Sequence, residues 1–282
     1  MSGRAFDQAE GPGKRGSRES LFVCAALVAA FSAVLAAQQA PTGYHSVACI
    51  KVKAENNSEF RKWSAGDVHK FAHSRVDGGA LSSWILLRAV IPAGTSAECD
   101  YVIVSMYPGA PPKPLDVDDL DAALKKAGVA MTGQQYVDRR TSLTTLVSNN
   151  MFQNRASVGS FKTGDYFVVN YMKALNMEDY VAWEKKAWQP MAEAMAKDNS
   201  RSGWSVNTLV FPGGTDVKFN AVTVDVYPTW ESIFNGNEHF YDMWRKAHPD
   251  MELGTTFEQY DKLRHQGDID VFVVQDYIAG SK

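Results

Sequence analysis

Two stretches of sequence decide the fold: WILLRAVIPAGTSAECDYVIVSMYP at residues 84–108 and WSVNTLVFPGGTDVKFNAVTVDVYP at residues 204–228. They align without a gap at an offset of 120 residues and share a leading tryptophan, a Pro-x-Gly-Thr turn and a final Tyr-Pro. Extended to 45–108 against 165–228, the alignment has 15 identities in 64 positions, where chance gives about four. A repeat this long that occurs twice indicates two copies of one domain, not a solenoid.

Each copy has the pattern of a strand, a helix, two strands, a helix and a strand. Asn176 is placed to cap the first helix of the second copy. The last strand of the first copy is the weakest prediction, because it is polar and the alignment loses register there. In the first copy we predict a strand at 47–53, a helix at 58–76, strands at 84–91 and 101–107, a helical stretch at 116–140 and a last strand at 143–152. In the second copy we predict a strand at 166–173, a helix at 178–197, strands at 204–211 and 221–227, a helical stretch at 239–265 and a last strand at 269–278.

This order of elements is that of the ferredoxin-like unit, a four-stranded antiparallel sheet with its helices on one face. The bare sheet face must be covered, and the second copy can cover it. In element order, duplication and Trp and Pro-Gly landmarks, the chain resembles the dimeric α/β-barrel superfamily over nearly all of residues 44–280. The resemblance implies an α+β fold of two tandem units, at 44–158 and 164–280, packed sheet to sheet as a pseudo-dimeric barrel. The superfamily includes cofactor-free monooxygenases, haem enzymes, isomerases and lyases, so the fold does not select a function.

The first 37 residues have the pattern of a cleaved secretory signal peptide. Lys14, Arg15 and Arg18 precede an apolar run at 21–37, and small residues cluster near its end. We therefore expect a periplasmic or secreted protein with no stable membrane insertion after cleavage. The formal net charge of −3 excludes strong whole-protein attraction to nucleic acid.

Alternation along the third strands predicts which side chains line the barrel. Val102, Val104 and Met106, with their counterparts in the second copy, form an apolar face that should pack under the helices. The opposite face would then point into the barrel, where Asp225 could act as a base in a semi-enclosed cavity. Asp225 could instead pair with a basic or amide group, such as Arg88 or Asn207, and only hold structure. The expected ligand-binding residues are Arg88, Ser105, Tyr107, Asn207 and Tyr227.

Three functions remain open at this stage. The first is binding of a small apolar or aromatic molecule in the barrel interior. The second is a cofactor-free enzyme of monooxygenase or isomerase type that uses Asp225 as its base, with Tyr107, Tyr227 and Arg88 orienting the substrate. The third is a non-catalytic structural or assembly protein, which a packed barrel interior would favour over a cavity of at least ~300 Å³. Homo-oligomerisation is left open.

The histidines give weak signals for a cofactor, and we expect none. His69 and His73 stand four residues apart, a spacing that can chelate a metal, but no third ligand is evident. His239 and His248 would be the candidate axial ligands of a haem protein. The GxxDG motif of dye-decolorising peroxidases lacks its first glycine at residues 74–78.

Cys49 and Cys99 fall on or beside neighbouring strands of the predicted first unit, so a bridge is open to them in an exported protein. Their counterparts at the offset of 120 are apolar, Val169 and Phe219. This pattern favours two free, buried thiols that behave as small hydrophobic residues.

Overall fold

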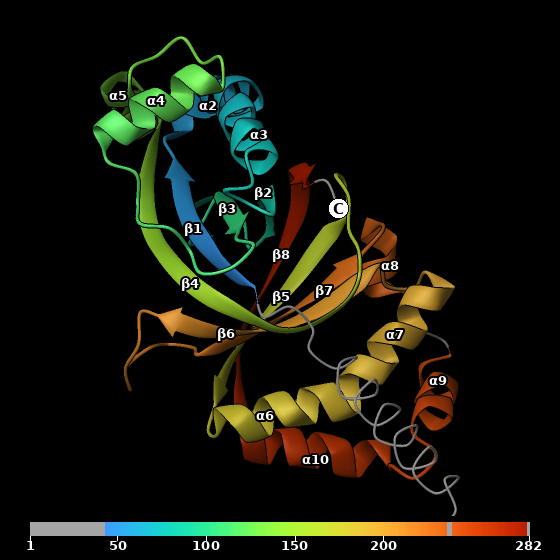
Figure 1. Ribbon diagram of the computed structural model, residues 1–282. Coiled ribbons are helices and arrows are strands. Elements are labelled where there is room, and N and C mark those ends of the chain that lie inside the picture. Colours follow the sequence, from blue (N-terminus) through green and yellow to red (C-terminus); the bar gives the residue numbers. More distant parts are fainter. Residues whose placement is uncertain (1–42, 236–238, 281–282) are drawn as a thin grey trace, which may run out of the picture. The chain divides into compact units, whose positions relative to one another are not determined.

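The computed structural model describes residues 43–235 and 239–280, which form one α+β unit. The predicted signal peptide at 1–37 lies outside the described residues. Eight antiparallel strands close into a barrel in the order β1-β3-β2-β8-β5-β7-β6-β4 (Figure 1). None of the helices within 43–235 and 239–280 has the length and hydropathy needed to cross a bilayer.

The first half of the barrel holds four strands and two pairs of helices. Its elements are β1 (Tyr44–Val52), η1 (Ala54–Asn56), α2 (Asn57–Trp63), η2 (Ser64–Val68), α3 (His69–Asp77), β2 (Ser83–Ile91), η3 (Gly94–Ser96), β3 (Tyr101–Met106), α4 (Val117–Lys126), α5 (Gly133–Leu143) and β4 (Thr144–Gly159).

The second half has the same order of strands and main helices, but it has one more short α-helix before its last strand and no described counterpart of η1 or η3. Its elements are β5 (Tyr166–Ala174), α6 (Met177–Trp183), η4 (Glu184–Trp188), α7 (Gln189–Asp198), β6 (Gly203–Phe211), β7 (Ala221–Tyr227), α8 (Trp230–Phe234), α9 (Phe240–Ala247), α10 (Leu253–Leu263) and β8 (Arg264–Ala279). Asn176 caps α6 as expected, because its side chain accepts hydrogen bonds from the backbone N–H groups of Glu178 and Asp179.

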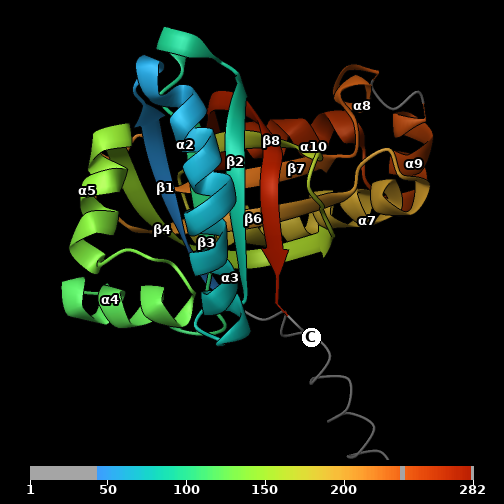
Figure 2. The same cartoon turned by 90° about the horizontal axis from the view of Figure 1, so that it is seen from above.

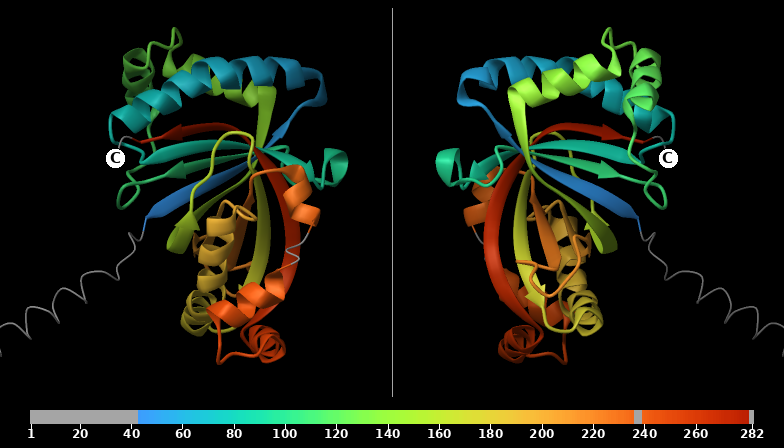
Figure 3. Two further views of the ribbon diagram at one scale, coloured as in Figure 1. Left: turned by 90° about the vertical axis from the view of Figure 1, so that its right-hand side faces the viewer. Right: turned by 90° about the vertical axis from the view of Figure 1, so that its left-hand side faces the viewer.

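Two strands of 16 residues, β4 and β8, join the halves. The first part of β4 pairs with β1, and its last part pairs with β6 of the other half. In the same way β8 pairs first with β5 and then with β2. Each half therefore has the strand order fourth-first-third-second, and each long strand belongs to both sheets. The helices of each half cover the outer face of its own strands (Figures 2 and 3).

The faces of the strands are the reverse of those predicted. Val102, Val104 and Val226 belong to the hydrophobic cluster inside the barrel, together with Phe167 and Phe272. Tyr101 and Ile103 belong instead to the cluster under the helices of the first half, as Ala221 does in the second. The prediction failed because the third strand of the first half is apolar on both sides, so alternation alone does not tell inside from outside.

Each predicted first helix is interrupted by a five-residue π-helical turn, η2 in the first half and η4 in the second. The two turns are 120 residues apart. Sequence periodicity gave no sign of them, because one wide turn shifts the apolar face by only a single residue. A π-turn widens the helix and turns one extra side chain toward the sheet, and such turns are frequent at functional sites.

The last strands keep the repeat register, contrary to the sequence-based expectation. β4 and β8 begin 120 residues apart, as do α5 and α10 before them. The register shifts at the first strands instead. Lys51 and Lys173 both reach the turn after the second strand of their own half, yet they differ by 122 positions. The difference arises because four residues connect β1 to α2 and only two connect β5 to α6.

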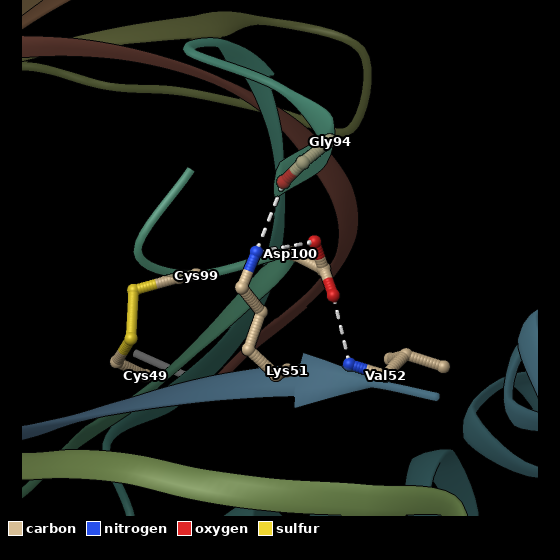
Figure 4. Close-up of a disulfide and its surroundings, with 6 residues drawn as sticks. All are labelled: Cys49, Lys51, Val52, Gly94, Cys99 and Asp100. Atoms are coloured by element: carbon tan, nitrogen blue, oxygen red, sulfur yellow. Dashed lines mark hydrogen bonds and ion pairs between the residues drawn. A yellow bond between two sulfur atoms is a disulfide. The ribbon is translucent and has the colours of Figure 1, made fainter. Parts of the chain in front are cut away.

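Cys49 and Cys99 form a disulfide (Figure 4), so the prediction of two free thiols is wrong. The two-residue shift explains the error. The counterpart of Cys49 is Tyr171 and not Val169, and the Tyr171 ring packs on Phe219 with 4.8 Å between centroids. An aromatic pair in the second half thus occupies the place of the disulfide in the first. Beside the disulfide, Asp100 accepts a hydrogen bond from Lys51 and another from the backbone N–H of Val52.

Gly159 ends β4 at the junction of the halves, opposite Gly203. Its φ is +75°, and an added Cβ would lie 2.1 Å from the Ser202 carbonyl oxygen. We expect Gly159→Ala to lower the free energy of unfolding by about 2–3 kcal/mol, from left-handed strain and displaced backbone. Urea unfolding followed by circular dichroism measures this.

The matched control is Gly254→Ala in α10, where nothing lies within 4 Å of an added Cβ. Alanine there should leave stability unchanged or raise it slightly, because alanine favours a helix over glycine. Equal effects of the two substitutions would show that the close approach at Gly159 is not a constraint.

Candidate functional site

The first half contains a cavity of about 250 Å³ between its helices and the outer face of its sheet. Helices α2, η2 and α3 form its roof, strands β1, β2 and β3 its floor, and α5 one side. Its walls are mainly apolar and aromatic, with Phe60, Trp63, Phe71, Trp84 and Tyr136 among them. The aromatic side chains brace one another, since the Trp63 ring lies 5.1 Å from Tyr136 and the Phe71 ring 5.6 Å from Tyr136.

A few polar groups point to this cavity. The indole N–H of Trp63 is buried without a hydrogen-bond partner in the described structure. Arg75 and the more exposed Arg140 are among the residues that line the cavity, as are Ser64, Ser105 and Thr144. The Arg75 guanidinium is positioned by the Phe71 ring, 5.9 Å from its centroid. The combination is an apolar pocket with a buried donor and two cations.

The equivalent place in the second half is occupied by larger, charged side chains. At the offset of 120, the cavity-lining Ser64, Leu81, Ser105 and Thr144 correspond to Glu184, Arg201, Asp225 and Arg264. Equivalent places in the two halves therefore hold an apolar cavity in one and a buried polar network in the other.

Asp225 lies at the centre of one part of this network. One carboxylate oxygen accepts a hydrogen bond from Arg201 and the other accepts one from Asn170, at 3.2 Å. Arg201 also donates to the Tyr227 hydroxyl at 2.8 Å, and it stacks between the rings of Tyr227 and Trp188. Asp225 thus pairs with Arg201, and not with the Arg88 or Asn207 considered from sequence.

Glu184 is the other acidic group of the network, and sequence reasoning missed it. The π-turn η4 places this side chain under the helices, where the residue is 3 % exposed. It accepts a hydrogen bond from the Tyr260 hydroxyl at 3.2 Å. Burial raises the pKa of the Glu184 carboxyl to about 7, against the lowering effect of the nearby Tyr180 and Arg264. The sequence did contain a signal for this residue, because Glu184 aligns with Ser64 at the offset of 120 and a charged residue therefore replaces a small one.

The sequence-predicted site residues do not form one site. Ser105 lines the first cavity, and Tyr107 lies beside it, within hydrogen-bond distance of Ser46. Asp225 and Tyr227 share Arg201 in the second half. Arg88 is exposed and lies opposite Tyr101 at the end of β2. Asn207 is buried in the barrel with Asn154, which donates to it at 3.0 Å.

The candidate haem ligands are placed differently. The Nε2 atom of His248 lies 2.8 Å from the Ala187 carbonyl oxygen, and its ring packs on Trp244. His239 precedes α9. Within the described residues, no group of three or more His, Cys, Asp or Glu side chains is arranged to hold a metal ion.

Comparison with known proteins defines the fold but not the activity. No protein-family model matches the sequence, and no curated protein matches it. A proposed monooxygenase from Fusobacterium nucleatum superposes with a TM-score of 0.51 over 86 % of this chain and 96 % of that chain, at 10 % identity. A proposed monooxygenase from Lactobacillus acidophilus has a TM-score of 0.48 over 84 % of this chain and 98 % of that chain, at 12 % identity. A chlorite dismutase variant from Candidatus Nitrospira defluvii has a TM-score of 0.46 over 84 % of this chain and 93 % of that chain, at 9 % identity. The similarity to the Fusobacterium nucleatum protein shows that the two chains share a fold.

The buried carboxyl gives a pH-dependent prediction. Because the pKa of Glu184 is near 4.5 when unfolded and about 7 when folded, the folded state holds an extra proton between these values. The stability of the wild-type protein should therefore fall, relative to Glu184→Gln, as pH rises from about 4.5 to about 7. The variant should be more stable by about 3 kcal/mol at pH 8, measured by urea unfolding at a series of pH values.

His45 also titrates in this range, since burial lowers its pKa to about 4. It is present in both proteins, so its effect cancels in the difference. Glu193→Gln, on the exposed face of α7, is the control and should show no such difference. A pH-independent difference for Glu184→Gln would refute the raised pKa.

Proposed function

We propose that the protein binds a small, largely apolar aromatic molecule that carries an acidic or hydrogen-bond-accepting group, in the cavity of the first half. The observation that carries this proposal is an aromatic-walled cavity with an unpartnered indole N–H and two arginines at its lining. The ligand class agrees with the sequence-based expectation, but the location differs. The barrel interior, where binding was expected, holds the hydrophobic cluster of Phe167, Phe272 and their neighbours.

The size of the cavity limits the ligand. A volume of about 250 Å³ is just below the range of drug-sized ligand pockets, which span roughly 300–1,000 Å³, so the ligand must be small. One or two fused rings fit this volume. Stacking and edge contacts with Trp63, Phe71 and Tyr136 would hold the rings.

The polar groups define the substituent. A carboxylate or phenolate would accept hydrogen bonds from Arg75 or Arg140, whose guanidinium groups match such oxygens. The Trp63 N–H is a donor only, so it too requires an acceptor from the ligand. A neutral hydrocarbon would leave this buried donor unpaired, at a cost of about 1–3 kcal/mol.

The test is a thermal-shift screen of one- and two-ring aromatic acids against their primary amides, followed by calorimetry. We expect the acids to bind more tightly than the amides. Ala72→Leu and Ser105→Leu, which fill the cavity, should abolish binding. Two filling variants on different elements guard against one that fails to fold.

Ala65→Leu is the matched control, because Ala65 lies on the exposed side of the π-turn η2. It should bind as the wild type does. Binding that survives both filling variants in folded protein would place the ligand elsewhere and refute the proposal. A folded protein that binds none of the acids would leave the structural or assembly role as the better reading.

The enzyme alternative is supported by the polar network of the second half. A carboxyl group with a pKa of about 7 can both accept and donate a proton at neutral pH, as general acid–base catalysis requires. Asp225, the base proposed from sequence, already has both carboxylate oxygens hydrogen-bonded by Arg201 and Asn170. We therefore assign the proton-transferring role to Glu184 and a positioning role to Asp225 in this alternative.

Because Glu184 lies in the second half and not in the first-half cavity, the whole series of one- and two-ring aromatic compounds is tested for turnover by oxygen uptake and product analysis, whether or not a compound binds the cavity. If the protein is an enzyme of this kind, Glu184→Gln should lower kcat by about 10²–10⁴-fold, and Asp225→Asn by less. Loss of turnover in Asp225→Asn with retention in Glu184→Gln would reverse the two roles. The absence of turnover in the wild type would leave the binding function alone.

We also infer that the chain is exported, to the periplasm or beyond, after loss of residues 1–37. The disulfide supports this inference, since such bonds persist in oxidising compartments. The repeated element order supports two tandem ferredoxin-like units at 44–158 and 164–280. Homo-oligomerisation stays a prediction and would have to use surfaces other than strand edges, because each strand of the barrel has two neighbours.

A further inference from the structure

Helix α3 carries two histidines and an aspartate on one face. His69, His73 and Asp77 follow one another at four-residue spacing, which places them side by side along the helix. All three line a surface groove of about 560 Å³ between α3 and the end of α4. The groove is outside the cavity of the first half, and the proposed function makes no use of it.

Each histidine has one ring nitrogen held by a carboxylate. The Nδ1 atom of His69 lies 2.6 Å from Asp276 of strand β8, and Nδ1 of His73 lies 2.8 Å from Asp77. A neutral imidazole that donates its Nδ1–H to a carboxylate has its lone pair on Nε2. Histidines that ligate metals are held in this way by an outer carboxylate, which fixes the tautomer and the ring orientation.

The two rings are near one another. Their centroids are 6.0 Å apart with 47° between the planes. An ion bound at ~2.0–2.1 Å by two ring nitrogens at a tetrahedral angle holds the ring centroids roughly 5 Å apart. Binding one ion through both rings therefore requires them to approach by about 1 Å, and the more exposed His73 is the ring that we expect to move.

We propose that His69 and His73 bind one divalent transition-metal ion, such as Zn²⁺ or Cu²⁺, through their Nε2 atoms. Asp276 and Asp77 act as positioning residues that orient the two rings. Water completes the coordination sphere in the open groove. The groove itself also contains the exposed Lys70 and Lys126 together with Asp77, and Asp276 contributes a second negative charge beside His69.

The attachment of His69 to β8 distinguishes this pair from two histidines on an isolated helix. Asp276 lies on β8 and pairs with Leu86 of β2, so its backbone is fixed in the sheet. One ligand is therefore ordered before the ion arrives, which lowers the entropic cost of binding.

The experiment is calorimetric titration of the metal-stripped mature protein, purified without a histidine tag, with zinc chloride. We expect saturation at one equivalent and loss of binding in both His69→Ala and His73→Ala. Asp276→Asn and Asp77→Asn should each weaken binding about 10–100-fold. In a parallel sample with Cu²⁺, electron paramagnetic resonance should show coupling to two imidazole nitrogens.

His265→Ala is the matched control, because His265 is an exposed histidine on β8, and it should bind as the wild type does. Asp77→Asn changes an exposed helix position and separates ring orientation from folding. A folded wild-type protein that binds no ion would overturn the proposal. So would binding unchanged by either histidine variant, or copper spectra that show coupling to a single nitrogen.

Discussion

The backbone pairing of β4 and β8 is the constraint on which the structure depends. Each strand spends its first part in its own sheet and its last part in the sheet of the other half. Because of this pairing, each strand of the barrel has two neighbours. The closed barrel encloses the hydrophobic cluster around Phe167 and Phe272, which neither half could bury alone. It also fixes which sheet face is left for the helices. The cavity of the first half and the polar network of the second both lie on that outer face.

The two halves show how one scaffold can hold two different environments. The backbone of the site is repeated, including the π-turn that directs residue 64 or 184 toward the sheet. The side chains have diverged in volume and charge. A serine at this position leaves room beside the aromatic walls, whereas a glutamate fills the room and is held by Tyr260. The difference between a pocket and a buried network therefore depends on a few substitutions at fixed backbone positions.

The sequence was sufficient for the order of the elements, the duplication and the barrel class, because these follow from periodicity and from turn residues that local chemistry requires. It was not sufficient for the direction of the strands' faces. Strand β3 is apolar on both sides, and only the packing of the two halves decides which side is enclosed. The register of β1 was also misjudged, since the matched lysines at 53 and 173 hide a two-residue difference in the connection to the first helix.

These errors determined which site residues were found. Asp225 was recognised as a charged residue on a strand, but its partner Arg201 lies in the connection before β6 and has no periodic pattern to mark it. Glu184 was missed although its spacing of four residues from Tyr180 already places it on the apolar face of the helix, because a charged side chain is not expected among buried residues. The disulfide was missed for a different reason, since its true counterpart is an aromatic pair that only the shifted register reveals.

The place of β8 in the barrel has a consequence for how the chain is made. Strand β2 finds its second neighbour only when residues 271–279 are present, and synthesis from the N-terminus delivers these residues after the other seven strands of the barrel. Until then the first half is an open sheet with an unpaired edge and an uncovered apolar face, a form that invites pairing with other chains. The barrel therefore closes only after β8 has been made. A polypeptide cut short within β8 would lose the pairing between the two halves on this side of the barrel.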